Sequence, residues 1–380
     1  MPGWAGSSWY FYRYMDPTNE KEFISKESQK YWSDIDIYFG GSEHATGHLL
    51  YSRFYQKFLY DLEYLNKDEY SKKLINQGMI LGNSAFIFRE SGSNKYISSN
   101  LISDNEVDKI RIDIKYVKDD NQVDYNLLKL EDSDFKNSTF KLENDSFYCI
   151  REQEKMSKSK FNVVNPDEIC DKYGADTLRM YEMFLGPIEQ SKPWDTRGIS
   201  GVHSFLKKFW SLFFKDGLFN VSEEEPSKES LKSLHKTIKK ITEDIEKLSL
   251  NTCISSFMIC INELSSMSCN NREILKELLI LISPFAPHFA EELWSQIGHK
   301  ESIVNQIYPV YNEKYLVETE KLYPVSFNGK TKFTINLPLN LSNKEIEEAV
   351  IKFDKTKSIL NNTEPKKIIV VPGKIINIVI

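Results

Sequence analysis

Apolar residues in the middle of the chain recur three and four residues apart. The spacing runs through Leu231, Leu234, Ile238, Ile241, Ile245 and Leu248. It places all six on one face of a helix. Similar patterns follow at roughly 251–267 and 272–297, and successive amphipathic helices favour an antiparallel bundle over residues 196–300. The stripe by itself indicates core packing rather than a functional face.

Near the carboxy terminus the period of the pattern changes. Asn328-Gly329 stands between two short apolar segments, 325–327 and 331–335, which is a strong signal for a hairpin turn. Ser342 and Glu345 form a capping-box pair that predicts a helix start. Apolar runs then flank Pro372-Gly373, and they occupy 368–371 and 375–380. These elements predict a small α+β domain over 323–380, joined to the bundle by a linker at 301–322.

The first half of the chain mixes aromatic segments with one helical pattern. Ser42-Glu43 is expected to open that helix, whose apolar face continues through Leu49, Leu50, Phe54, Phe58 and Leu62. Residues 83–150 are polar and are expected to be an insertion. Within them Ile110, Ile112, Ile114 and Tyr116 alternate with polar residues, which predicts a half-buried strand. A loop and helix pattern returns at 151–195.

Composition and charge exclude several classes of protein. The net charge of −6 argues against a generic binder of polyanions, although local lysine pairs such as Lys207-Lys208 and Lys366-Lys367 leave phosphate contacts open. Any one pair is more simply a solvated face. Five cysteines without C-x-x-C spacing predict neither a disulfide framework nor a zinc site, and they favour a reducing cytoplasm. The sequence has no apolar stretch long enough to cross a bilayer.

The segment Lys155-Met156-Ser157-Lys158-Ser159 concentrates two ammonium groups and two hydroxyls in five residues. Cations aimed at a leaving pyrophosphate stabilise the charge that develops in the transition state. The hydroxyls of Ser157 and Ser159 can hold phosphate oxygens or the loop itself, and Met156 can anchor the loop against an apolar or adenine surface. The simpler alternative for an arbitrary segment of this kind is a solvated basic turn.

This segment resembles the second hallmark motif of class I aminoacyl-tRNA synthetases. The following runs are also similar to that family, at 162–168 (Asn-Val-Val-Asn-Pro-Asp-Glu) and 173–179 (Tyr-Gly-Ala-Asp-Thr-Leu-Arg). Phe161 departs from the pattern, because many members carry glycine there, and the larger residue is expected to restrict the loop. The resemblance implies that Lys155, Ser157, Lys158 and Ser159 are catalytic, and that Lys158 and Met156 bind ATP.

The upstream segment 40–51 resembles the leucyl members of the family, of bacterial type. It reads Gly-Gly-Ser-Glu-His-Ala-Thr-Gly-His-Leu-Leu-Tyr. The resemblance implies that Gly41, Glu43 and His48 lie on the ATP side, and that Tyr38 and His44 line the leucine pocket. A glycine permits close backbone approach, and a carboxylate can accept two ribose hydroxyls.

His44 and His48 are four residues apart, so they are expected to share one helix face. That spacing also occurs in zinc sites, but the sequence shows no third ligand nearby, and we therefore expect no protein-bound metal. The alternative is a pair of partly buried histidines with structural partners.

Two further stretches carry the resemblance. The aromatic run 7–14 implies that Trp4, Ser7 and Tyr10 line the aminoacyl pocket, where the residues alone would indicate core. Residues 283–294 (Ser-Pro-Phe-Ala-Pro-His-Phe-Ala-Glu-Glu-Leu-Trp) match the anticodon-binding helix bundle that leucyl, isoleucyl and valyl enzymes share. The last hairpin, with 370–374, resembles the small carboxy-terminal domain of bacterial leucyl enzymes, which contacts tRNA.

The expected architecture is therefore multidomain α/β and α. The second half of a Rossmann-type catalytic domain precedes a helix bundle and a small α+β domain. The expected segments are the catalytic half, the insertion, the lysine loop with its stem region, the bundle, the linker and the terminal domain, at 1–82, 83–150, 151–195, 196–300, 301–322 and 323–380.

The sequence predicts ATP-dependent ligation of leucine to tRNA(Leu) through leucyl-adenylate, with ATP as substrate together with Mg²⁺, in the cytoplasm. None of the six histidines lies in a His-Ile-Gly-His context, so the first catalytic half and the editing domain are expected to be missing and the chain alone to be inactive. The alternatives are a subunit of a split synthetase, whose partner chain carries the amino-terminal half, and a non-catalytic tRNA-binding remnant. Valine or isoleucine as substrate is a third possibility, disfavoured by the histidine pair.

Overall fold

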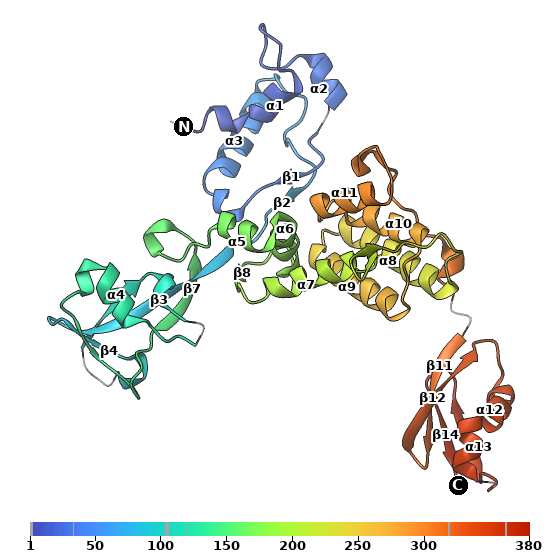
Figure 1. Cartoon of the computed structure of the whole chain (residues 1–380). Coiled ribbons are helices and arrows are strands. Elements are labelled where there is room, and N and C mark those ends of the chain that lie inside the picture. The colour runs from blue at the N-terminus through green and yellow to red at the C-terminus, as the bar shows by residue number, and fades with distance from the viewer. Residues whose placement is uncertain (1–2, 33, 103–105, 119, 318–319, 362) are drawn as a thin grey trace. The chain divides into compact units, whose positions relative to one another are not determined.

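The computed structural model describes residues 3–32, 34–102, 106–118, 120–317, 320–361 and 363–380. The chain divides into two compact units, Met1–Pro226 with Thr237–Pro309, and Ser227–Lys236 with Val310–Ile380. Figure 1 shows the elements of both. The finer division into six segments stays a proposal. Four insertion residues (103–105 and 119) and two linker residues (318 and 319) lie outside the described part.

The amino-terminal region packs helices around a very short parallel sheet. Strand β1 (Tyr38–Phe39) pairs with β2 (Leu74–Ile75) over two residues each. Helices α1 (Tyr10–Met15), α2 (Lys26–Trp32) and α3 (His48–Asp61) belong to the same region. A small core holds it together through Phe11, Tyr12, Ile24, Tyr38, Leu65 and Tyr70.

The prediction that one helix opens at Ser42-Glu43 is wrong. Ser42–His44 form a separate 3-10 turn, and the turn at 45–47 interrupts the chain before α3 begins at His48. His44 and His48 therefore lie on different elements and do not share a helix face, although the charge of His44 still lowers the pKa of His48.

The insertion and the segment after it form a mostly antiparallel sheet around one long strand. Strand β3 (Ile80–Glu90) pairs with β5 (Val107–Ile112), β7 (Ile150–Lys155) and, in parallel, β8 (Lys192–Pro193). Strands β4 (Lys95–Ile97) and β6 (Thr139–Lys141) extend it, and α4 (Tyr125–Glu131) lies in the same segment. A core that includes Ala85, Ile87, Leu128 and Phe147 fills this region.

The strand predicted around Ile110 to Tyr116 is confirmed only in its first part. Strand β5 ends at Ile112. The Asp113 side chain accepts the Lys115 N–H and starts a 3-10 turn at Ile114–Tyr116. This local hydrogen bond competes with the extended ladder and ends the strand.

The helical part confirms the periodic pattern, with one break. Leu234, Ile238 and Ile241 on α8 are buried, as the stripe predicts. The single helix expected at 272–297 is two helices, because the turn at 283–286 and Pro287 prevent continuation. The helices are α5 (Pro166–Tyr173), α6 (Ala175–Phe184), α7 (Ile199–Trp210), α8 (Lys228–Glu246), α9 (Leu250–Ser266), α10 (Arg272–Ile282) and α11 (Pro287–Gln296). A small hairpin of β9 (Phe214–Lys215) and β10 (Leu218–Phe219) follows α7.

The carboxy-terminal unit confirms the predicted α+β pattern. Asn328 and Gly329 both have positive φ, 47° and 82°, as a tight hairpin turn requires, and the capping box at Ser342 and Glu345 is present. The sheet order is β12-β11-β14-β13. Its elements are β11 (Glu320–Phe327), β12 (Lys330–Pro338), α12 (Asn343–Lys352), α13 (Asp354–Leu360), β13 (Lys367–Val371) and β14 (Ile375–Val379).

Candidate active site

The lysine loop, residues 155–162, begins where β7 ends. Lys155 is the last residue of that strand, and Lys158–Lys160 form a 3-10 turn. Phe161 follows with φ 49°, in the left-handed region. This position favours glycine, which is the residue that the resemblance led us to expect there.

Asn162 closes the loop, a role that the sequence did not indicate. Its side chain is buried. Its Oδ1 accepts the Ser157 N–H at 3.0 Å, and its Nδ2 donates to the Ser84 hydroxyl at 3.0 Å and to the Lys155 carbonyl at 3.4 Å. One buried amide therefore fixes both ends of the loop to strand β3.

Glu154 stands beside the loop and binds two cations. Arg111 Nη1 donates to its Oε2 at 2.6 Å, and Lys160 Nζ lies 3.2 Å from its Oε1. The Arg111 hydrogen bond, followed by those from Ser84 and Lys160, lowers the pKa of Glu154 to about 2. The carboxylate is therefore ionised throughout the range in which enzymes are assayed.

The predicted catalytic residues lie between the start of this loop and its 3-10 turn. Lys155 and Lys158 are exposed, and within the described part of the chain neither ammonium group has an ion pair or hydrogen bond. The Ser157 and Ser159 hydroxyls lie 3.0 Å apart. The arrangement presents two unpaired cations and two hydroxyls on a braced turn, which suits an anionic ligand.

Met156 packs toward the sheet rather than away from it. A side chain at Gly82 would place its Cβ 3.0 Å from Met156 Cγ and 2.4 Å from the Asn162 carbonyl oxygen. Strand β3 therefore needs glycine at this position to admit the loop.

A second group of predicted residues forms what we call the Tyr–His cluster, Tyr10, Tyr38 and His48. The Tyr38 hydroxyl lies 3.0 Å from the Tyr10 hydroxyl and 2.5 Å from His48 Nε2. The rings of Tyr38 and His48 also stack, with centroids 5.9 Å apart. Tyr38, expected in the leucine pocket, is thus bonded to His48, expected on the ATP side, and not to His44.

Burial governs the protonation of this cluster. Desolvation raises the pKa of Tyr38, so its phenol stays neutral. Desolvation and then the charge of His44 lower the pKa of His48, which favours a neutral imidazole. His48 Nδ1 is buried and has no partner among the described residues.

The remaining predicted residues lie around the cluster. Trp4 stacks on Tyr51 at 6.0 Å and approaches Gly47, where an added Cβ would lie 3.2 Å from the indole. Ser7 Oγ donates to the Trp4 carbonyl at 3.0 Å. The Glu43 carboxylate folds over Gly41, leaving only 2.0 Å to a Cβ built there. His44 is exposed.

The lysine loop and the Tyr–His cluster are separate groups. Within the described ranges, no hydrogen bond, ion pair or ring contact joins them.

Helix α3 carries an exposed apolar stripe, in which Leu50, Phe54 and Phe58 have exposed fractions of 58%, 62% and 48%. Residues four apart share a helix face, so this is one continuous apolar surface.

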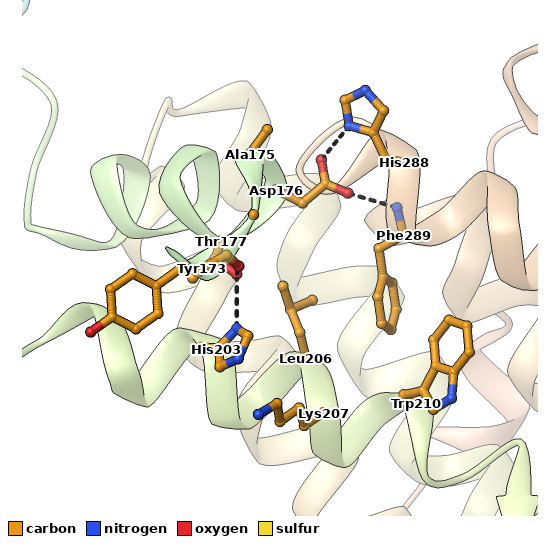
Figure 2. Close-up of a pocket in the computed structure, with 11 residues that line it drawn as sticks. Tyr173, Ala175, Asp176, Thr177, His203, Leu206, Lys207, Trp210, His288 and Phe289 are labelled. Carbon is orange, nitrogen blue, oxygen red and sulfur yellow. Dashed lines mark hydrogen bonds and ion pairs between the residues drawn. The ribbon is translucent and has the colours of Figure 1, made fainter. Parts of the chain in front are cut away.

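A pocket of about 400 Å³ brings together two motifs that lie more than a hundred residues apart. Figure 2 shows the Asp176 carboxylate joined by dashed lines to His288 and to the backbone nitrogen of Phe289. The Asp176 carboxylate accepts the Phe289 N–H at 2.6 Å and lies 2.9 Å from His288 Nδ1, so it caps helix α11 from outside. The wall consists of Tyr173, Gly174, Ala175, Asp176, Thr177, His203, Leu206, Lys207, Trp210, His288 and Phe289.

Two kinds of feature are absent from the described residues. They contain no group of three or more His, Cys, Asp and Glu side chains placed to hold a metal ion. None of their helices combines the length and apolar character needed to cross a membrane.

Comparison with protein families gives two matches. Residues 141–195, which include the lysine loop, match the model of tRNA synthetases class I (I, L, M and V). Residues 227–348 match the model of the anticodon-binding domain of tRNA ligase. Both models describe parts of synthetases, and they cover separate parts of the chain.

Individual proteins match over the whole chain. The leucine–tRNA ligases of Flavobacterium psychrophilum and Christiangramia forsetii are 59% and 57% identical over 100% of the chain, which covers 40% and 39% of those proteins. In the solved ternary complex of Agrobacterium radiobacter K84 agnB2 LeuRS, tRNA and LeuAMS, one chain matches with a TM-score of 0.59 and 26% identity. That match covers 98% of this chain and 42% of that one. The chain thus spans about 40% of the length of the curated relatives it matches.

Proposed function

The chain belongs to the leucine–tRNA ligase family, whose carboxy-terminal part it matches, and on this premise we propose that it takes part in the ligation of leucine to tRNA(Leu). The observation that carries the proposal is the loop fixed by Asn162, on which two exposed lysines have no ion pair or hydrogen bond to any described residue. It lies inside the segment that matches the class I model.

The proposed reaction has two steps. The leucine carboxylate attacks the α-phosphate of ATP, which enters with Mg²⁺ as the substrate complex, and pyrophosphate leaves as leucyl-adenylate forms. A terminal ribose hydroxyl of tRNA(Leu) then takes the leucyl group and AMP leaves. Lys155 and Lys158 stabilise the pyrophosphate as its charge develops, and Ser157 and Ser159 donate to its oxygens. Catalysis rests on positioning and charge, with no covalent enzyme intermediate.

The Tyr–His cluster lies at the proposed boundary between leucine and adenosine. Trp4, Ser7, Tyr10, Tyr38 and His44 are proposed to line the leucine pocket, and Gly41, Glu43 and His48 to contact ATP. The hydrogen bond between Tyr38 and His48 supports one network across both sides. A neutral His48 suits this position, because its Nε2 can accept a hydrogen bond from the Tyr38 hydroxyl.

Binding of tRNA is proposed for the bundle and the carboxy-terminal unit, within the cytoplasm. Residues 227–348 match the anticodon-binding model, which supports the first. Contacts to phosphate by lysine release counterions, so binding should weaken steeply with salt. A filter-binding titration of the 380-residue chain with tRNA(Leu) tests this, and the absence of binding at low salt would remove the tRNA part of the proposal.

The main alternative is a subunit of a split synthetase that acts with a separate chain, or a tRNA-binding remnant without catalysis. The share of 40% of the relatives' length keeps both alternatives open. Discrimination against valine and isoleucine depends on small apolar groups, worth about 1–3 kcal/mol, so substrate choice needs a direct comparison.

The deciding experiment joins the chain to the amino-terminal remainder of the Flavobacterium psychrophilum relative, or supplies that remainder as a second chain. ATP–pyrophosphate exchange is then measured with leucine, valine and isoleucine. Exchange driven by leucine far above the other two supports the proposal. Exchange driven by valine or isoleucine instead, or none with any amino acid, would refute it.

A further inference from the structure

Three lysines lie on the lysine loop, and they differ in exposure and in ion pairing. Lys155 and Lys158 are exposed and, in the described part of the chain, unpaired, whereas Lys160 is half-buried and bound to Glu154. A triphosphate approaching the loop would therefore meet two available ammonium groups and a third that is already neutralised.

Strand geometry explains why Glu154 reaches Lys160. Glu154 lies on β7 opposite Gly82 of β3, whose missing side chain leaves the loop close to the sheet. Ser84, on the same face of β3, binds Asn162 and contributes to the low pKa of Glu154. The carboxylate therefore lies beside the buried anchor of the loop.

The other partner of Glu154 comes from the insertion. Arg111 lies on β5, which pairs with β3 opposite Phe86. Its guanidinium lies over the Phe86 ring at 4.5 Å and donates to Glu154 with two nitrogens, at 2.6 and 3.4 Å. The ring and the two-point bond fix the carboxylate at the distance that Lys160 needs. A backbone bond from the Ile114 N–H to the Phe161 carbonyl, 3.2 Å long, ties the same insertion to the loop.

We propose that Glu154, held by Arg111 of the insertion, is a positioning residue that sorts the lysines of the loop. It retains Lys160 on the sheet, and it leaves Lys155 and Lys158 as the cations presented to the substrate. The chemical class of that substrate, a nucleoside triphosphate, rests on the proposed function, whereas the sorting itself rests only on the contacts above. The insertion thereby acts on the reaction without touching the reacting atoms.

The sorting is tested on the 380-residue chain by brief acetylation and mass spectrometry of each lysine. In the wild type, Lys160 should react several-fold more slowly than Lys155 and Lys158. Glu154→Gln should raise the rate at Lys160 to that of Lys158. The matched control is Glu152→Gln, because Glu152 lies two residues earlier on β7 and pairs with Lys109 at 2.5 Å. This change should raise the acetylation rate of Lys109 only.

Arg111→Met supplies a second variant that keeps the Glu154–Lys160 pair but removes the clamp on the carboxylate. It should give an intermediate rate at Lys160, and Arg111→Lys should restore part of the protection. Equal rates at Lys160 and Lys158 in the wild type, or no change at Lys160 in Glu154→Gln, would overturn the proposal.

The consequence for catalysis is measured in the joined protein. Glu154→Gln should slow adenylate formation about tenfold, since small displacements of charged groups are costly, while leucine affinity stays unchanged and Glu152→Gln behaves as wild type. Normal adenylate formation in Glu154→Gln, together with faster acetylation of Lys160 in the same variant, would overturn the positioning role. If the wild-type joined protein makes no adenylate, the proposed function fails. The acetylation rates of the lysines still decide whether Glu154 sorts them.

Discussion

The lysine loop and the Tyr–His cluster differ in how much of the described chain surrounds and holds them. The loop lies against the six-stranded sheet that contains β3 and is fixed by Asn162, Glu154 and Arg111. The cluster lies beside a parallel pair of two residues per strand. An exposed apolar stripe lies on another face of α3 than His48. Parallel sheets are normally covered on both faces.

From this difference we propose that the leucine pocket is present residue by residue but that its surface is incomplete in this chain. The backbone of the lysine loop is held by the Asn162 side chain and by the Ile114 N–H. The ammonium groups of Lys155 and Lys158 have no partner within the described chain. Among the residues proposed for the leucine pocket, Ser7 bonds to Trp4 and Tyr10 to Tyr38. Leu50, Phe54 and Phe58 on α3 meet solvent. Contiguous exposed apolar surface of this kind marks an interaction site.

The largest expected effect tests this incompleteness. The 380-residue chain alone should show no leucine-dependent pyrophosphate exchange above background, at least about 10³-fold below the joined protein, because both reactants must be held in line for the chemistry. The two proteins are compared at equal concentration with saturating ATP and leucine. Robust exchange by the isolated chain would show that the cluster is a complete site after all.

A second, smaller effect concerns the loop. Lys158→Ala in the joined protein should lower the rate of adenylate formation about 10²–10³-fold, the usual result of removing one aimed donor, with leucine affinity nearly unchanged. Ser159→Ala should be milder, because a neutral hydroxyl contributes less than an ammonium group. Pre-steady-state adenylate formation and leucine binding are measured together. A change in leucine affinity with an unaltered chemical step would make the loop structural.

The third effect concerns the cluster. Tyr38→Phe removes the hydroxyl between Tyr10 and His48 and leaves both without that partner, so leucine affinity should fall about tenfold. Tyr12→Phe is the matched control, since its hydroxyl bonds Gln56 at 2.5 Å in the same core but is not proposed to contact substrate. Equal losses in the two variants would assign the effect of Tyr38 to core stability.

Local patterns predicted much of this molecule. They missed the local breaks before α3, after β5 and between α10 and α11, and they could not indicate contacts between distant residues. The hairpin at Asn328-Gly329, the capping box at Ser342 and the stripe on α8 follow from neighbours in sequence. The lysine loop was predicted from a motif and its composition. The bond between Arg111 and Glu154 joins residues 43 positions apart, and no short-range pattern indicates it. The same holds for Asn162, whose hydroxyl partner is 78 positions away.

The smallest effect returns to the loop and to Phe161. Phe161 has φ 49°, and steric strain at such a φ destabilises a residue with a side chain by about 1–2 kcal/mol. Glycine has no such strain, but it loses more conformational entropy on folding, which costs about 0.5–1 kcal/mol. Phe161→Gly should therefore stabilise the loop by about 0–1.5 kcal/mol, since the strain relieved exceeds the entropy lost.

Phe161→Val should instead weaken the loop, because a branched side chain is strained in this region. Two compact units make global unfolding a poor measure, so hydrogen exchange at the Ser157 and Ile114 amides, which bond to Asn162 and Phe161, is followed instead. Val163→Gly is the control, since Val163 has no positive φ to relieve, and it should only loosen the loop. Faster exchange in Phe161→Gly than in Val163→Gly would contradict this prediction. It would show that the Phe161 side chain holds the loop in place and that its left-handed backbone does not destabilise the loop.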